Sequence, residues 1–355
     1  MAVKASGSPL SFSEIETEFG QNNDRDLGEY RVTQTVGGLS NQPLDTSIPQ
    51  NGSISFSDFY SKRLNVVIDY HSGSTENRPD DARTKYQAGS TSGNRTIIGG
   101  FKDRISGDSS RSKVRIHVNK TIGSAVGNGN TCAVRTGSFE TGTVVTVEVG
   151  SSGAIYGAGG NGGEAGDGSG ANGENGGSGS SGLGVQFSGT TVINNGVISA
   201  GYGGGGGGGY RKVEREEMFS GPVYAANGGG GGGGQGLPAG EGIDGGTDGT
   251  TTAGGNGGNG GENNQAHGGG GGGGGSNGTG GEGGNNNDGG NGTSSSGGNG
   301  ADGTHTGSIE GENNVQGEGG TGGGNGAAIR RTSGITVNIP STSGITGATN
   351  ATGVS

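Results

Sequence analysis

The chain has 355 residues, of which 96 are glycine and none is tryptophan, and only 24% are hydrophobic. That apolar share is about half of what an ordinary globular domain carries, which excludes a large conventional core over much of the chain. The net charge of −11 lies entirely in residues 151–355, because residues 1–150 hold 16 basic and 16 acidic residues. An acidic, lysine-poor region argues against binding to phosphate backbones, so we expect no nucleic-acid partner.

Cys132 is the single cysteine, which rules out an internal disulfide and a cysteine-based zinc site. Residues 1–10 lack the apolar centre of a signal peptide, and no stretch approaches the ~20 apolar residues of a membrane span. We therefore expect neither a secretion leader nor membrane insertion.

Residues 1–64 contain one short motif twice, since Leu-Ser-Phe-Ser-Glu-Ile at 10–15 is echoed by Ile-Ser-Phe-Ser-Asp-Phe at 54–59. A serine that precedes an acid by three residues can cap a helix, and the acid suits the positive end of the helix dipole. The spacing predicts two brief helices, capped by Ser11 with Glu14 and by Ser55 with Asp58.

Phe12, Ile15 and Phe19 lie at i, i+3 and i+7, an apolar stripe that a single short helix cannot bury alone. The stripe needs a partner, either the second helix or another protein. The region is therefore either a small self-contained subdomain or a docking module, and both interpretations stay open. The candidate attachment residues are Phe12, Ile15, Phe19, Phe56, Phe59 and Tyr60.

Residues 65–150 predict a β-rich domain. The stretches 65–70, 113–121 and 143–149 are rich in β-branched residues and roughly alternate in polarity, and Gly/Ser/Asn clusters separate them. This is the part of the chain best able to form a conventional core.

From residue 150 onward glycine dominates, with 78 of the 96 glycines in residues 151–355. Much of it has period three, as in Gly-Gly-Asn-Gly-Gly-Asn at 254–259 and Gly-Gly-Glu-Gly-Gly-Asn at 280–285. Such composition can mean a flexible linker, but the period indicates helices with three residues per turn.

Polyproline II geometry has no internal hydrogen bonds, so its N–H and C=O groups must be satisfied by neighbouring helices. Close approach of backbones leaves no room for a Cβ, so we expect fully surrounded helices to be glycine on every face. The tracts 203–209, 228–234 and 268–275 meet that condition. Collagen is excluded, because it needs one glycine per triplet and abundant proline.

Segments with few glycines also repeat within this region. Residues 145–157, 191–201 and 335–347 each predict a strand, a turn and a second short strand. We interpret them as edge elements that begin and end the glycine slab.

Catalytic and metal-binding motifs are absent or uninformative. Matches to GxGxxG carry little weight at this glycine content without a strand and helix around them. The aspartates among the glycines lack the spacing of calcium-binding nonapeptides, and the four histidines lack any ligand pattern. We expect no cofactor, no metal site and no enzymatic activity.

Residues 210–224 stand out between two all-glycine tracts, because they combine aromatic and basic residues, the types that dominate recognition surfaces. The alternative is a solvated connecting loop. We favour recognition and name as candidate receptor-binding residues Tyr210, Arg211, Lys212, Arg215, Met218, Phe219, Tyr224, Leu237 and His267.

Glycine tracts separated by short divergent loops resemble the tail-fibre-tip adhesins of T-even-like bacteriophages, and the 10–16 and 54–60 motifs look like those opening fibre proteins of tailed phages, marine myoviruses among them. In that family an N-terminal region attaches to the fibre and a polyglycine II sandwich presents distal loops to a bacterial receptor. By position, the family's glycine motifs correspond to 203–209, 228–234, 254–261 and 268–275, and its variable loops to 210–226, 237–252, 263–267 and parts of 276–316.

The resulting expectation is a mostly β and irregular fold with short N-terminal helices, a small β-rich domain, and a C-terminal sandwich of packed polyglycine II helices flanked by short strands. Residues 1–64 would attach to other tail-fibre or virion proteins, 65–150 would form the β-rich domain, and 151–355 the glycine-rich sandwich. The insert at 65–150 departs from the compact family pattern.

The resemblance implies a virion protein at the fibre tip, assembled in the host cytoplasm, that binds a protein or glycan of the bacterial outer surface. The alternative is a structural fibre or capsid-surface component without receptor binding. An ice-binding protein would need a flat Thr/Ala face, which the many outward Glu, Asn and Asp positions disfavour.

Overall fold

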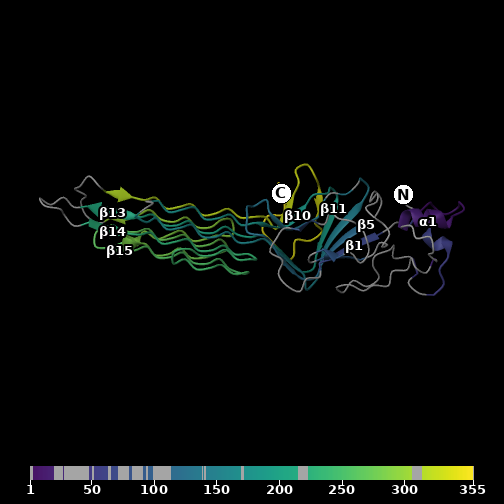
Figure 1. Cartoon of the computed structure of the whole chain (residues 1–355), viewed down its shortest axis with the longest axis horizontal. Coiled ribbons are helices and arrows are strands. Elements are labelled where there is room, and N and C mark those ends of the chain that lie inside the picture. Colours follow the sequence, from purple (N-terminus) through teal and green to yellow (C-terminus); the bar gives the residue numbers. More distant parts are fainter. Residues whose placement is uncertain are drawn as a thin grey trace.

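The computed structural model describes residues 3–19, 27, 48–49, 52–62, 65–70, 80–81, 91–92, 95–98, 113–137, 139, 141–168, 172–214, 223–305 and 314–354. The molecule is elongated (Figure 1). The N-terminal helix α1 lies at one end, strands follow in the middle, and extended glycine segments run from them to small strands at the far end.

The N-terminal part contains α1 (Phe12–Phe19) and the 3₁₀ turn η2 (Phe56–Phe59). Both predicted helices are therefore present, each beginning after its predicted serine. The second is a 3₁₀ turn of four residues rather than an α-helix.

Three sheets of mainly parallel strands form the middle of the molecule. The first has the order β20-β11-β8-β5-β1-β4-β3, the second β2-β7-β10-β19-β22, and the third β21-β12-β9-β6. The strands are β1 (Asn65–Tyr70), β2 (Asp80–Asp81), β3 (Thr91–Ser92), β4 (Arg95–Ile98), β5 (Lys113–Val118), β6 (Thr121–Gly123), β7 (Cys132–Arg135), β8 (Val144–Val149), β9 (Ala154–Tyr156), β10 (Ser181–Val185), β11 (Thr190–Asn194), β12 (Val197–Ser199), β19 (Ile329–Arg331), β20 (Val337–Asn338), β21 (Ile345–Thr346) and β22 (Ala351–Thr352).

In chain order these strands visit the second, first and third sheet in turn, as β7-β8-β9, β10-β11-β12 and β19-β20-β21. The chain thus winds as a parallel β-helix with three faces. Equivalent residues stack from coil to coil, as in the ladder Ile122–Ile155–Ile198–Ile345 of the third sheet. The first three of these isoleucines are fully buried and belong to one core with the valines of β5 and β8.

The repeated strand-turn-strand segments are therefore successive coils of this β-helix, and the glycine-rich segments begin and end at them. The pairing of the coils depends on partners far away in the chain. β8 pairs with β11 and β7 pairs with β10, so the expected boundary at residue 150 does not coincide with the limit of the strand region.

The glycine-rich segments are insertions at one corner of the β-helix, between a third-sheet strand and the next second-sheet strand. Residues 157–180 connect β9 to β10, and residues 200–328 connect β12 to β19. At the same corner, the other two coils have only the short connections 124–131 and 347–350.

Within the insertions the chain runs back and forth as straight segments, which we call rods (Figure 1). The inner rods are 203–209, 228–234 and 268–275, and the outer rods are 157–168, 172–180, 240–243, 246–250, 253–261, 278–283, 289–293, 297–303 and 317–326.

Hydrogen bonding between the rods has a period of three residues. Along the first inner rod, the N–H groups of Gly204 and Gly207 donate to rod 172–180. Those of Gly205 and Gly208 donate to rod 228–234, and those of Gly206 and Gly209 to rod 297–303. With the same three-residue period, its carbonyl groups accept hydrogen bonds from rods 157–168, 268–275 and 317–326. This rod therefore has six hydrogen-bonded neighbours.

The other two inner rods also have six neighbours each, and the three inner rods bond to one another. Among the described residues, the nine outer rods form a closed ring in the order 157–168, 172–180, 317–326, 297–303, 289–293, 278–283, 253–261, 246–250 and 240–243, each bonded to the next. The tracts without any side chain are the ones with neighbours on all sides.

Two small sheets complete the far end of the rods. One has the order β14-β13-β18 and the other β15-β16-β17. Their strands are β13 (Arg211–Glu214), β14 (Val223–Ala226), β18 (Val315–Gln316), β15 (Glu262–Asn263), β16 (Ala266–His267) and β17 (Thr304–His305), and the 3₁₀ turn η3 (Gly284–Asn286) lies beside β16 and β17.

The first prediction concerns the inner rods. A Cβ on Gly205 would overlap the carbonyl oxygen of Gly272 in the adjacent inner rod, whereas a Cβ on Gly324 would meet no atom within 4 Å. We expect Gly205→Ala to lower the free energy of unfolding by about 2 kcal/mol or more, because backbones must separate. Gly324→Ala is the matched control and should leave it within about 0.5 kcal/mol. Thermal unfolding followed by calorimetry measures both, and equal stability of the two variants would contradict the packing described.

Candidate functional site

The distal end of the molecule is a small sandwich of two three-stranded sheets that close the rods (Figure 1). Side chains alternate along β13, so Arg211 and Val213 face the second sheet and Lys212 and Glu214 face outward. Val213 packs with Ala226 and Ala266 and with the ring of Tyr224 in a core separate from that of the β-helix. The β-hairpin is thereby fixed to the rods by its inner face.

Arg211 lies inside this sandwich and is 2% exposed. Its Nη1 donates to Gln316 Oε1 at 3.4 Å, and its Nη2 lies 3.2 Å from His305 Nδ1. Because a guanidinium can only donate, His305 Nδ1 is the acceptor and the ring is neutral with its proton on Nε2. Burial, followed by the charges of Arg211 and His267, lowers the pKa of His305.

The outward face of the β14-β13-β18 sheet carries a compact mixed patch. Lys212 Nζ forms an ion pair with Glu214 Oε1 at 2.7 Å. Two large apolar side chains flank the pair, Val223 at 52% and Val315 at 37% exposed. We call Lys212, Glu214, Val223 and Val315 the distal patch.

The structure divides the predicted receptor residues into four groups, of which Leu237 alone forms the last. Lys212 lies on the outward face of the hairpin. Tyr210, Arg211 and His267 are buried, at 7%, 2% and 9% exposure, and the partly buried Tyr224 packs against the inner core, so the tip holds most of these four side chains inside. Arg215, Met218 and Phe219 lie outside the described residues.

Leu237 was predicted to belong to the same surface, and this position was wrong. Its carbonyl accepts the N–H of Ser124, and its own N–H donates to the carbonyl of Gly157, which directly follows β9. Leu237 therefore lies at the base of the rods, beside the β-helix. Sequence reasoning also missed Glu214, Val223 and Val315, although alternation along the hairpin contained the signal for the first two.

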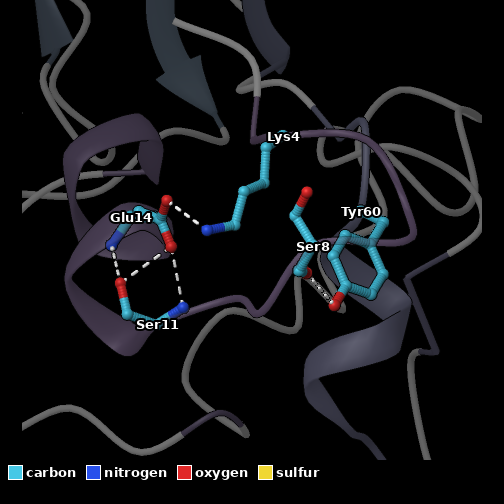
Figure 2. Close-up of polar contacts among 5 residues, drawn as sticks. All are labelled: Lys4, Ser8, Ser11, Glu14 and Tyr60. Carbon is cyan, nitrogen blue, oxygen red and sulfur yellow. Dashed lines mark hydrogen bonds and ion pairs between the residues drawn. The ribbon is translucent and has the colours of Figure 1, made fainter.

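The second candidate site is the N-terminal module, residues 3–19 and 52–62. The capping box of α1 is complete, because the N–H and Oγ of Ser11 both donate to Glu14 Oε2 at 2.8 Å and the Glu14 N–H donates to Ser11 Oγ at 3.3 Å (Figure 2). The second copy of the motif repeats this, with the Ser55 N–H donating to Asp58 Oδ2 at 2.7 Å. Both copies thus fold by the same local rule.

Polar contacts tie the N-terminal segment to both motif copies. Lys4 Nζ lies 2.6 Å from Glu14 Oε1, and the hydroxyl of Tyr60 donates to the carbonyl of Ser8 at 2.7 Å (Figure 2). The Ser61 N–H donates to the Lys4 carbonyl. The hydrogen bond from Lys4 and then those from Ser11 lower the pKa of Glu14 to about 2.

The apolar residues of the two copies occupy equivalent places. Ile15 and Phe59 are fully buried, while Phe12 and Phe56 meet edge to face with ring centroids 6.1 Å apart. Phe56 remains 39% exposed. The side chain of Phe19 lies outside the described residues. Val3, Ile15 and Phe59 belong to one hydrophobic core with the strands of the β-helix, so the module packs on the β-helix and leaves Phe56 exposed.

Other chemistry is limited in the described part of the chain. No group of three or more His, Cys, Asp or Glu is placed to hold a metal ion there. Burial raises the pKa of the Cys132 thiol to about 12, so this thiol is unreactive at neutral pH. None of the described helices has the length and hydrophobicity that crossing a bilayer requires.

Comparison with known proteins gives one family and one structure. The family model described as phage tail fibre adhesin Gp38 matches residues 84–278. The crystal structure of the gp37-gp38 adhesin tip complex of the bacteriophage S16 long tail fiber aligns at 16% identity, covering 98% of this chain and 99% of that chain, with a TM-score of 0.37. No curated protein sequence gives a significant match.

The second prediction concerns the Glu14 cap. Its folded pKa of about 2 lies below the ordinary 4.5, so its contribution to stability is present above pH 4.5 and is lost as the pH falls through about 2. We expect an NMR titration of the Glu14 carboxyl carbon to have its midpoint near 2, and Lys4→Met to move that midpoint upward. A wild-type midpoint near 4.5 would contradict the ion pair and the cap.

Proposed function

Because the chain belongs to the Gp38 family of phage tail fibre adhesins, whose model matches more than half of it, we propose that it binds a receptor on the bacterial surface through the distal end of its rods. We further propose that it occupies the fibre tip and joins the fibre through its N-terminal module. The observation that carries this proposal is the placement of the two candidate sites at opposite ends of an elongated molecule (Figure 1).

We propose that the rods are polyglycine II helices, as the sequence period predicts. Successive residues of an inner rod bond to three different neighbours and the fourth returns to the first, which is the pattern of a helix with three residues per turn. A bundle bonded in this way resists bending. It would hold the tip sandwich in a fixed orientation and limit the conformational entropy lost on binding.

The distal patch supports the receptor role. Exposed valines beside a Lys–Glu pair offer a partner both apolar area and hydrogen-bonding groups, the combination found in recognition surfaces. Glu214 and Val223 also begin and end the connection that contains Arg215, Met218 and Phe219. The partner would be a protein or glycan of the outer surface. This role requires no cofactor and no catalytic group.

The N-terminal module supports attachment to another fibre protein. Phe56 is exposed beside Phe12 although the other motif residues, Ile15 and Phe59, are buried, so the module retains an aromatic contact for a partner. We propose that assembly takes place in the host cytoplasm and that the mature protein belongs to the virion.

The third prediction tests receptor binding. We expect Val223→Asp to slow adsorption of virions to their host by about tenfold or more, because an apolar contact is replaced by a desolvated charge. Val126→Asp is the matched control, since Val126 is 53% exposed but lies in the 124–131 connection of the β-helix. It should leave adsorption unchanged, while both variants keep the wild-type melting temperature.

Normal adsorption of the Val223→Asp virion would remove the distal patch from the proposal. If substitutions of Lys212 and Val315 also left adsorption unchanged, the alternative of a structural virion component without receptor binding would be favoured. Electron microscopy then separates the two roles, because a receptor-binding protein must occupy a distal end of a fibre.

The fourth prediction tests attachment. We expect Phe56→Ser to reduce incorporation of the protein into virions by about tenfold, because an exposed aromatic anchor is lost while the buried Ile15 and Phe59 are retained. Quantitative mass spectrometry of purified particles measures it, with Val126→Asp again as control. Full incorporation together with an unaltered fold would exclude Phe56 from the attachment surface.

A further inference from the structure

The outer rods use one two-residue motif to bond to each other. In the pair Asn259-Gly260, Asn259 Oδ1 accepts the N–H of Glu282 at 2.9 Å, and the Gly260 N–H donates to the carbonyl of the same Glu282 at 2.8 Å. Asn256-Gly257 does the same with Thr279, one turn earlier. We call this arrangement a bracket, meaning an Asn-Gly or Asp-Gly pair held by both its side-chain oxygen and its following N–H on one neighbouring rod.

Brackets recur around the bundle. When the neighbouring rod is parallel, one of its residues takes both hydrogen bonds of the bracket. When it is antiparallel, two of its residues, two positions apart, take one hydrogen bond each. Among the described residues the bracketing side chains are Asn161, Asn172, Asn175, Asn256, Asn259, Asn291, Asn299, Asn325, Asp248, Asp288 and Asp302. An outer rod has no neighbouring rod on its solvent side, so some of its N–H groups find no backbone carbonyl there. The side-chain oxygen of the bracket accepts the hydrogen bond instead.

Asn-Gly is also the dipeptide most prone to deamidation. The backbone nitrogen of the glycine attacks the asparagine Cγ, the nitrogen loses its proton, and the side-chain amide leaves as ammonia. Water then opens the resulting succinimide to aspartate or to isoaspartate. Ring closure requires rotation about the Asn Cα–C bond, so that the glycine nitrogen turns toward Cγ.

In a bracket this rotation breaks two hydrogen bonds to a rod that is itself fixed on its other sides. Burial does not account for the protection, because Asn256, Asn259, Asn291 and Asn299 are exposed to solvent. Asn128, Asn195, Asn227 and Asn277 are equally exposed and also precede glycine, but they lie outside any bracket. The Gly196 N–H donates to Asn194 Oδ1, and the Gly278 N–H donates to the Gly274 carbonyl. In neither pair do the asparagine side chain and the following N–H bond to the same neighbouring rod.

The two hydrolysis products have different consequences for a rod. Aspartate preserves the acceptor oxygen, and the chain already uses Asp248, Asp288 and Asp302 in brackets. Isoaspartate inserts a methylene into the main chain and shifts every later residue of a rod out of its three-residue register. A glycine bundle rich in Asn-Gly therefore depends on suppressing this reaction.

We propose that the brackets protect the Asn-Gly pairs of the rods from deamidation, and that among the described residues the unbracketed Asn128, Asn195, Asn227 and Asn277 are the preferred sites at which the folded chain deamidates.

The test is incubation of the full-length protein in mildly alkaline buffer for weeks, with isoaspartate and aspartate quantified at each site by peptide-mapping mass spectrometry. We expect Asn256 and Asn259 to react at least about tenfold more slowly than Asn195 and Asn277, the effect of about one hydrogen bond. The same sites in the denatured chain should react at similar rates. Equal rates in the folded protein would overturn the proposal.

Two variants test the cause within one molecule. Glu282→Pro removes the N–H that donates to Asn259 Oδ1, together with the exposed Glu282 side chain, and proline suits the extended threefold conformation. It should accelerate reaction at Asn259 and leave Asn256 unchanged, and Thr279→Pro should do the reverse. Unchanged rates at the targeted site in both variants, with normal melting temperatures, would overturn the role of the bracket. Because the wild-type comparison needs no variant, the test survives if either proline prevents folding.

Discussion

The rest of the structure depends on one constraint, which is that a glycine rod has no hydrogen bonds within itself. Each of its N–H and C=O groups must find a partner on another rod or remain unpaired, and unpaired buried groups are costly. Rod 203–209 meets the demand with six neighbours, and the outer rods meet it with the ring and the brackets. Since glycine also loses the most entropy on ordering, no rod is stable alone and the bundle must form cooperatively.

The β-helix solves the problem of starting such a bundle. Its coils fix the first bonds of each insertion, because the Gly157 N–H donates to the Ser199 carbonyl and the Gly201 N–H to the Ser180 carbonyl, next to β12 and β10. The isoleucine ladder supplies the conventional hydrophobic stabilisation that the glycines cannot. The rods are thus continuations of coil-to-coil pairing, and both insertions leave from the same corner for that reason.

Local features of the sequence predicted the local parts of this structure. The caps at Ser11 and Ser55 depend on residues three positions apart, and the all-glycine tracts follow from the absence of any Cβ. Partners distant in sequence could not be inferred in this way. Ile198 pairs with Ile345 across the long insertion, and Arg211 is buried only because β16 and β17 cover the inner face of its hairpin. Alternation reveals that a hairpin has two faces, but not which one another sheet will cover.

This construction separates the part of the chain that can change from the part that cannot. On an inner rod a single methyl group would overlap a neighbouring carbonyl, as at Gly205, so these positions have no freedom of composition. Outer positions tolerate a side chain, and many must supply an acceptor oxygen. The outward positions of the distal sheet, such as Lys212, Val223 and Val315, meet neither restriction. Freedom of composition is therefore greatest at the distal end, where we propose that the receptor binds, while the scaffold keeps its register.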